Sequence, residues 1–138
     1  MMKTVFADTG YWIALLDPQD TLHSKAINLS ITFTQVQIVT SEMVLTEILN
    51  HFSKRGNFLR YAAANFIESL QENPAITIIP QTDSIFQQAL ILYKQRPDQA
   101  WSHTDCSSFC IMQQQNILEA LAYDKHFEQA GFIALLRY

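Results

Sequence analysis

The chain has 138 residues, of which 49% are hydrophobic and 16% are charged. This balance is typical of a compact soluble domain and excludes a disordered or fibrous chain, and the length predicts one domain, residues 1–138. The net charge is −4, so the chain as a whole offers no general attraction for nucleic acid.

Two features indicate a cytoplasmic protein without a membrane partner. No run of eighteen apolar residues could span a bilayer, and Asp8 interrupts the short apolar start that might be mistaken for a signal peptide. Cys106 and Cys110 lie four residues apart, but they lack the partners of a zinc site or of a disulfide framework. We therefore expect both to be reduced thiols.

In the first part of the chain, strands and helices alternate. Residues 3–7 are β-branched or aromatic, which favours a short buried strand. The apolar run 11–16 could open a helix, and residues 23–33 have the spacing of a second one. A second strand is predicted at 37–40.

The next predicted helix begins after Ser41, which suits an N-cap, and stops at the basic residues and glycine of 54–56. Its apolar face is formed by Val44, Leu45, Ile48, Leu49 and Phe52. Glu47 lies on the flank of that face, where a carboxylate is harder to accommodate than on the solvent side. A helix at 58–70 and a third strand at 75–79 follow.

The remaining helices carry recognisable end signals. One runs from Thr82 or Asp83 to about Tyr93. Another begins at Ser102, because an acid three residues later, Asp105, completes a pattern similar to a capping box. Asn116 stands where that helix needs a residue in the left-handed conformation.

The chain is predicted to close with a fourth strand at 117–122, Asp124, a short helix, a turn at Gly131 and a last strand at 132–136. Since strands and helices alternate throughout, we expect a three-layer α/β/α sandwich around a mainly parallel central sheet.

Two carboxylates are predicted near the carboxyl ends of strands, where open α/β sheets bind ligands. Asp8 ends the first strand and Asp124 follows the fourth. Each could instead bond its own backbone in a turn, Asp105 could act only on the helix dipole, and Glu47 could bond a neighbour. Several carboxylates in one crevice repel one another, and such an oxygen-only set favours a hard ion, Mg²⁺ or Mn²⁺.

Three stretches resemble the PIN domain family, a nuclease fold found in the VapC-type toxins of bacterial toxin–antitoxin pairs. They are FADTGYWIALLD near the start, TSEMVLTEILN in the middle and WSHTDCSSFCIMQQQNILEALAYDKHFEQAGF at the end. The order of strands and helices also fits, so the resemblance covers essentially the whole chain. One departure is Asn116, where relatives usually have glycine, and asparagine can take the same backbone conformation.

The resemblance implies a ribonuclease that hydrolyses RNA phosphodiester bonds with Mg²⁺ or Mn²⁺. The family's catalytic and metal-binding acids fall on Asp8, Glu47, Asp105 and Asp124. Ser102 and Thr104 fall where a hydroxyl often assists the site. The resemblance also implies RNA as substrate, a cognate antitoxin protein as partner, and a homodimer.

The basic residues balance the other acids. Setting aside the four family acids leaves 9 of the 13 acidic residues, against 9 lysines and arginines. We expect phosphate contacts from Lys54, Arg55 and Lys125, with further candidates at Arg60, Lys94, Arg96 and His126, although a solvated surface also explains each one alone. His126 could equally cap or pack at a helix start.

Two other functions stay open on the sequence. A PIN-like interaction module with little or no nuclease activity would share the fold, but the presence of all four acids argues against a decayed site. A DNA nuclease or another phosphohydrolase would keep the metal and change the substrate. Against one such class, the stretch Asp8-Thr9-Gly10 lacks the DxD of haloacid-dehalogenase-type phosphatases.

Overall fold

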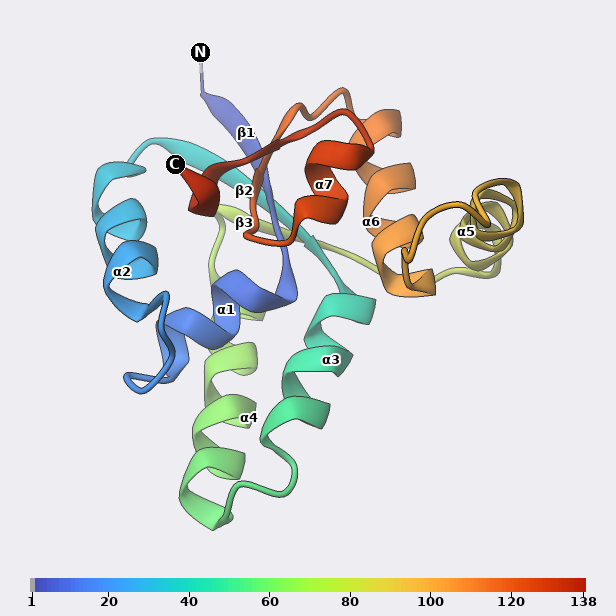
Figure 1. Cartoon of the computed structure of the whole chain (residues 1–138). Helices are drawn as coiled ribbons and strands as arrows, with labels where there is room; N and C mark the ends of the chain where they lie inside the picture. The colour runs from blue at the N-terminus through green and yellow to red at the C-terminus, as the bar shows by residue number, and fades with distance from the viewer. Residues whose placement is uncertain (1) are drawn as a thin grey trace.

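A computed structural model describes residues 2–138, in which five strands form one sheet among seven α-helices (Figure 1). The strands are β1 (Lys3–Ala7), β2 (Val36–Ser41), β3 (Ile76–Ile79), β4 (Glu119–Leu121) and β5 (Ile133–Ala134). Their order across the sheet is β3-β2-β1-β4-β5, and every neighbouring pair is parallel. The predicted α/β class with a parallel sheet is therefore confirmed.

The helices cover both faces of this sheet. They are α1 (Thr9–Leu16), α2 (His23–Thr32), α3 (Glu42–Phe52), α4 (Asn57–Glu72), α5 (Asp83–Gln95), α6 (His103–Gln114) and α7 (Lys125–Gln129). The chain moves outward from β1 to β3 through α1–α4, then crosses back to β4 and on to β5 through α5–α7. Because such crossovers are right-handed, the two groups of helices lie on opposite faces. Figure 1 shows α6 and α7 together, apart from α1 and α2.

The last two strands are shorter than predicted. Strands were expected at 117–122 and 132–136, but the structure has the shorter β4 and β5 within these ranges. Only two residue pairs join β4 to β5. After β5 the chain turns into a short 3₁₀ helix, η1 (Leu135–Arg137), in which the Leu136 N–H donates to the Ala122 carbonyl. A short apolar run does not by itself distinguish a strand from a buried turn, which is why the prediction was too long.

The predicted helix starts are confirmed by their caps. The side chains of Ser41 and Thr82 accept hydrogen bonds from N–H groups three residues later. The end of α3 differs from the prediction, since the helix stops at Phe52 and Gly56, at φ 90°, precedes α4 instead. Asn116 adopts φ 56°, the left-handed conformation expected of it.

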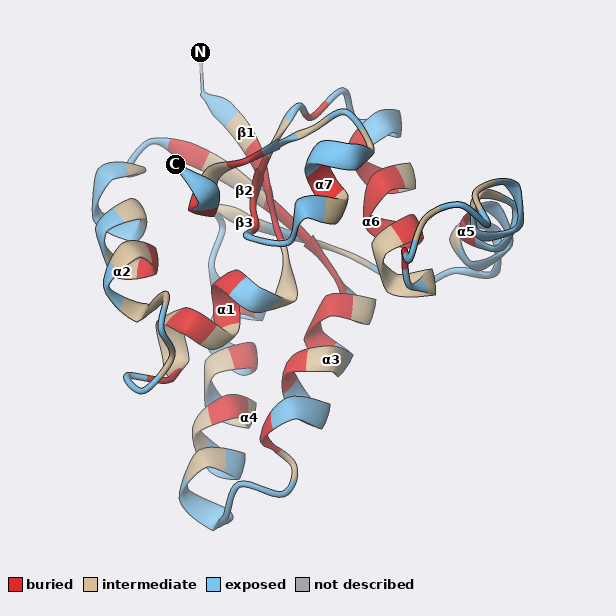
Figure 2. Ribbon diagram, viewed as in Figure 1, coloured by how far each residue is buried: buried red, intermediate tan, exposed pale blue. Residues whose placement is uncertain are grey.

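Buried residues lie along β1 and on α3 and α6, as the colours of Figure 2 show, and also in β4. Four large aromatic residues are buried in the core: Trp12, Trp101, Phe109 and Phe127. Leu49, expected on the apolar face of α3, is exposed instead. The two cysteines are free thiols, and burial raises the pKa of Cys106 to about 11. Within residues 2–138, no helix is both long and apolar enough to cross a bilayer.

Candidate active site

The site lies where the strand order reverses. β1 has β2 on one side and β4 on the other, and α/β sheets bind ligands beyond the carboxyl ends of strands at such a switch point. Asp8 directly follows β1, and its N–H still pairs with the Leu121 carbonyl of β4 at 3.1 Å. Asp124 follows β4 at the start of α7. Both carboxylates therefore arise at one edge of the sheet, as predicted.

A buried hydrogen-bond chain fixes the backbone beside Asp8. The Thr40 hydroxyl of β2 donates to the Ala7 carbonyl at 2.8 Å, and it accepts from the Trp12 indole N–H at 3.2 Å. These two bonds tie the end of β1 to α1 and to β2. Because buried polar groups are costly to leave unpaired, this arrangement strongly favours one position for the residue that follows Ala7.

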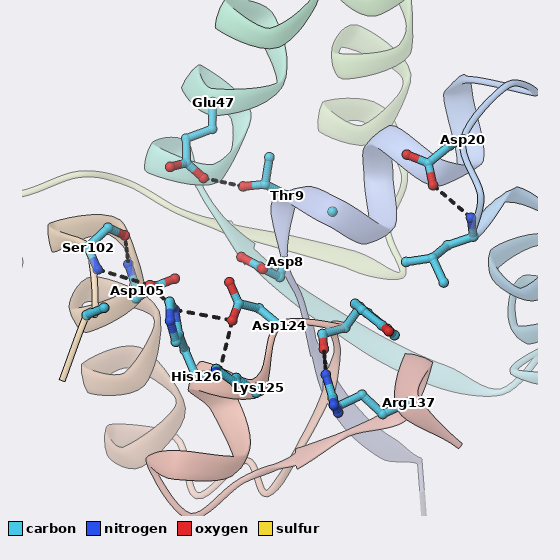
Figure 3. A pocket seen from close by; sticks show the side chains of 14 residues that line it. Asp8, Thr9, Asp20, Glu47, Ser102, Asp105, Asp124, Lys125, His126 and Arg137 are labelled. Atoms are coloured by element: carbon cyan, nitrogen blue, oxygen red, sulfur yellow. Dashed lines mark hydrogen bonds and ion pairs between the residues drawn. The ribbon is translucent and has the colours of Figure 1, made fainter.

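All four acids predicted from the sequence line one cavity of about 710 Å³. Asp8 comes from the end of β1, Glu47 from α3, Asp105 from the first turn of α6 and Asp124 from the start of α7. Figure 3 shows their carboxylates directed toward a common space. The fold thus gathers acids that are up to 116 positions apart in the sequence.

In three of these carboxylates, one oxygen accepts hydrogen bonds from protein groups. Glu47 accepts from the Thr9 hydroxyl through Oε1. Asp105 accepts from the Ser102 N–H through Oδ2 at 3.0 Å, and Asp124 accepts from the His126 N–H through Oδ1 at 3.1 Å. The other oxygen of each carboxylate has no hydrogen-bond donor among residues 2–138. Helix capping and ligand binding, which were alternatives on the sequence, are therefore compatible here.

Burial and the neighbouring acids together raise the pKa of Asp8 to about 7. Burial of the half-buried carboxyl is the largest cause, and a backbone hydrogen bond from Thr9 opposes it. The carboxylates of Asp105, Glu47 and Asp124 each add to the rise. Like charges that disfavour one another in this way are relieved by a bound cation.

The donor set fits a hard cation that keeps part of its hydration shell. Within the described residues, no three histidine, cysteine or acidic side chains are grouped as a ready-made metal cage. Mg²⁺ is usually held by one or two carboxylates and several waters, and the free oxygens of Glu47, Asp105 and Asp124 suit that mode. A closed site with nitrogen or sulfur ligands does not fit this chemistry.

The other predicted site residues divide into two groups. Ser102 and Lys125 line the cavity, and the Ser102 hydroxyl accepts from the Asp105 N–H at 2.9 Å. Thr104 is not part of the cavity lining. Lys54 and Arg55 are exposed beyond the end of α3, outside the lining, where Arg55 binds Asp17 at 3.2 Å. Of the three expected phosphate contacts, the structure brings only Lys125 to the site.

The lining also contains charged and aromatic residues that had no assigned role on the sequence, Asp20, Tyr123 and Arg137, together with His126. His126, left open between site and helix start, places Nδ1 at 3.0 Å from Asp105 and 3.2 Å from Asp124. Its position two residues after Asp124 was the available signal. Arg137 had none, because it lies just beyond the last predicted strand, 132–136.

A sequence model of the PIN domain family matches residues 5–133. The chain belongs to the PIN domain family. This PIN domain is similar to the 23S rRNA-specific endonuclease VapC20 of Mycobacterium tuberculosis, with 28% identity over 130 residues, 94% of this chain and 95% of the relative. The fold and the family expected from the sequence are confirmed.

Two solved structures resemble this PIN domain. The crystal structure of VapC20, described as a Sarcin-Ricin loop cleaving toxin, matches with a TM-score of 0.82 and 27% identity over 94% of this chain and 96% of the other. FitAcB from Neisseria gonorrhoeae matches with a TM-score of 0.64 and 16% identity over 94% of each chain. The second likeness supports the fold alone.

Proposed function

We propose that this PIN domain is a Mg²⁺- or Mn²⁺-dependent ribonuclease that hydrolyses RNA phosphodiester bonds at the four-acid cavity. The observation that carries the proposal is the convergence of Asp8, Glu47, Asp105 and Asp124 on one space, with the pKa of Asp8 raised to about 7. The similarity to VapC20, an rRNA endonuclease by its name, supports RNA as the substrate.

The chain's own residues divide the work of such a reaction. Asp8, Asp105 and Asp124 would hold a divalent ion directly or through water, and Glu47 would hold a second ion or accept a proton from the attacking water. When bound, the ion supplies positive charge that stabilises the phosphate as it reacts. Thr9, Ser102 and His126 would keep the carboxylates aimed at the cavity, since each contacts one or more of them.

The first test is cleavage of two RNA probes by the purified chain. One is an RNA carrying the sarcin–ricin loop, because VapC20 is described as a Sarcin-Ricin loop cleaving toxin, and the other is a mixed RNA pool. We expect cleavage with Mg²⁺ or Mn²⁺ and none with a chelator. Asp8→Asn and Asp105→Asn should abolish it, because each removes a charge from the proposed ion site.

Asp83→Asn is the matched control. Asp83 also lies in the first turn of a helix, α5, but it is not part of the cavity lining. Equal activity of the wild type, Asp8→Asn and Asp105→Asn would contradict the proposed site. If the wild type cleaved neither RNA and calorimetry detected no divalent ion, a PIN-like interaction module would replace the nuclease as the function.

We further propose that the chain is the toxin of a toxin–antitoxin pair. The similarity to VapC20, which is named a toxin, supports this role. Expression of the chain alone should stop bacterial growth, and co-expression with the product of an adjacent short reading frame should restore it. Growth arrest that Asp8→Asn does not relieve would contradict a nuclease toxin.

A homodimer belongs to the same proposal. On α5, four large apolar side chains are exposed in the single chain: Phe86, Leu90, Ile91 and Tyr93. Exposed apolar side chains grouped on one element favour burial against another protein surface. Sedimentation of the purified chain as a monomer at micromolar concentration would contradict the dimer.

A further inference from the structure

Tyr123 and Arg137 form one wall of the cavity that holds the four acids. Figure 3 shows Arg137 and Ser102 on opposite sides of the carboxylates, so this wall lies beyond Asp124, away from α6. Tyr123 immediately precedes Asp124, and Arg137 comes from η1. Folding alone brings the two together.

The Arg137 guanidinium is held in a fixed position. Its Nη1 donates to the Tyr123 carbonyl at 2.8 Å, and its Nε lies 3.1 Å from Glu128 Oε1. The second oxygen of Glu128 accepts from the Tyr138 hydroxyl at 2.8 Å, which fixes the carboxylate in turn. Within residues 2–138, Nη2 has no protein partner. A guanidinium positioned in this way is suited to a phosphate oxygen.

The Tyr123 ring has one covered face. Arg137 Cζ lies 4.9 Å from the ring centroid, a cation–π contact, whereas Tyr123 as a residue is 49% exposed. An exposed aromatic ring at the edge of a cavity offers its other face to a flat partner. Base–aromatic stacking is such a partnership, and it requires a base that is not stacked inside a duplex.

The charge of the cavity also favours a cation in this wall. Four carboxylates repel the phosphates of an approaching RNA, and a divalent ion compensates them only at the reacting phosphate. Arg137 and Lys125 are the lysine and arginine side chains among the lining residues. They stand where the phosphate of a neighbouring nucleotide would need a positive partner.

We propose that Tyr123 and Arg137 bind an unpaired nucleotide next to the scissile phosphate, with its base stacked on Tyr123 and its phosphate on Arg137. The proposal rests on the ribonuclease function proposed above. It assigns the substrate to RNA in which at least one base is free of a helix, such as a loop. Tyr123 and Arg137 would then determine which position of that loop is cut.

The test measures RNA binding separately from cleavage. In the Asp8→Asn background with Mg²⁺, the probe is a short single-stranded RNA carrying 2-aminopurine, whose fluorescence falls on stacking. Tyr123→Ala should weaken binding about tenfold and remove the fluorescence quench, and Tyr123→Phe should keep both. Arg137→Ala should lower the slope of log Kd against log salt by about 0.7, the value for one phosphate contact, and Arg137→Lys should keep the slope.

Lys54→Ala is the control for loss of an exposed positive charge outside the cavity, and it should change neither readout. Binding by Tyr123→Ala and Arg137→Ala within twofold of the Asp8→Asn parent would overturn the proposal, as would absence of RNA binding by that parent. Undiminished cleavage by Asp8→Asn would instead overturn the proposed nuclease site. The two failures are therefore distinguishable.

Discussion

Thr9 of α1 donates a hydrogen bond of 2.5 Å to Glu47 of α3, across 38 positions of sequence. Since Thr9 directly follows Asp8, this bond sets the Glu47 carboxylate beside the end of β1. It also occupies only Oε1, so that Oε2 stays free of protein donors among the described residues. The side chain next to the first acid thus positions the second.

Replacing Thr9 with valine keeps the side-chain shape and removes this donor. A hydrogen bond to a charged group contributes roughly 1.5–3 kcal/mol, so we expect kcat/KM for RNA cleavage to fall about ten- to a hundredfold. Thr9→Ser keeps the hydroxyl and should remain within a few-fold of wild type. A Thr9→Val variant as active as Thr9→Ser would show that this bond does not position Glu47 for the reaction.

His126→Ala removes the ring that contacts both Asp105 and Asp124. Loss of a group that orients metal ligands typically costs 10–100-fold in metal affinity or activity. We therefore expect the Mg²⁺ concentration for half-maximal cleavage to rise by about tenfold or more.

His103→Ala is the matched control for His126. His103 likewise lies at the start of a helix, α6 instead of α7, but its Nε2 contacts the Phe86 carbonyl at 3.1 Å and it is outside the cavity lining. If both substitutions shift the Mg²⁺ requirement equally, the effect does not come from the contact of His126 with the acids.

The raised pKa of Asp8 predicts how the stability of the metal-free protein depends on pH. Its pKa is about 7 when folded and about 3.8 in the unfolded chain, so between these values the folded state keeps a proton that the unfolded state loses. Its contribution to the free energy of unfolding is thus fully present below about pH 4, declines as pH rises, and is lost above about pH 7.

Thermal melts across this range measure the effect. Asp8→Asn has no such proton to lose, so its melting temperature should exceed that of the wild type near pH 8 and approach it near pH 4. Added Mg²⁺ should stabilise the wild type more than the variant at pH 8. Parallel stability curves for the two proteins would contradict the raised pKa.

Ser102→Ala tests whether Ser102 only caps α6 or also contributes to RNA cleavage. The Ser102 hydroxyl caps α6 by accepting from the Asp105 N–H, so its loss should cost about 1 kcal/mol of stability. Thr82→Ala removes the equivalent cap of α5, which lies away from the cavity, at a similar cost. We expect cleavage to fall only in Ser102→Ala, as measured by initial rates on one RNA probe. Equal rates would reduce Ser102 to a helix cap.

Local patterns predicted most of the fold, and the family resemblance implied the set of four acids. Caps at Ser41, Thr82 and Ser102 act over three residues, and an apolar face repeats within one helix, so both can be read from the chain. The ends of the short last strands could not be read, because only two residue pairs define β5. Pattern and resemblance together placed Asp8, Glu47, Asp105 and Asp124 at one cavity.

The sequence by itself thus determined the order of strands and helices, the parallel sheet and the acids at its edge. Only the tertiary structure decided which charged residues join those acids. It brought His126 to Asp105 and Arg137 to Tyr123, and it left Lys54 and Arg55 outside the cavity. The physical reason is range: hydropathy and capping depend on neighbours in sequence, whereas these contacts depend on how β4, α7 and η1 pack beside α6.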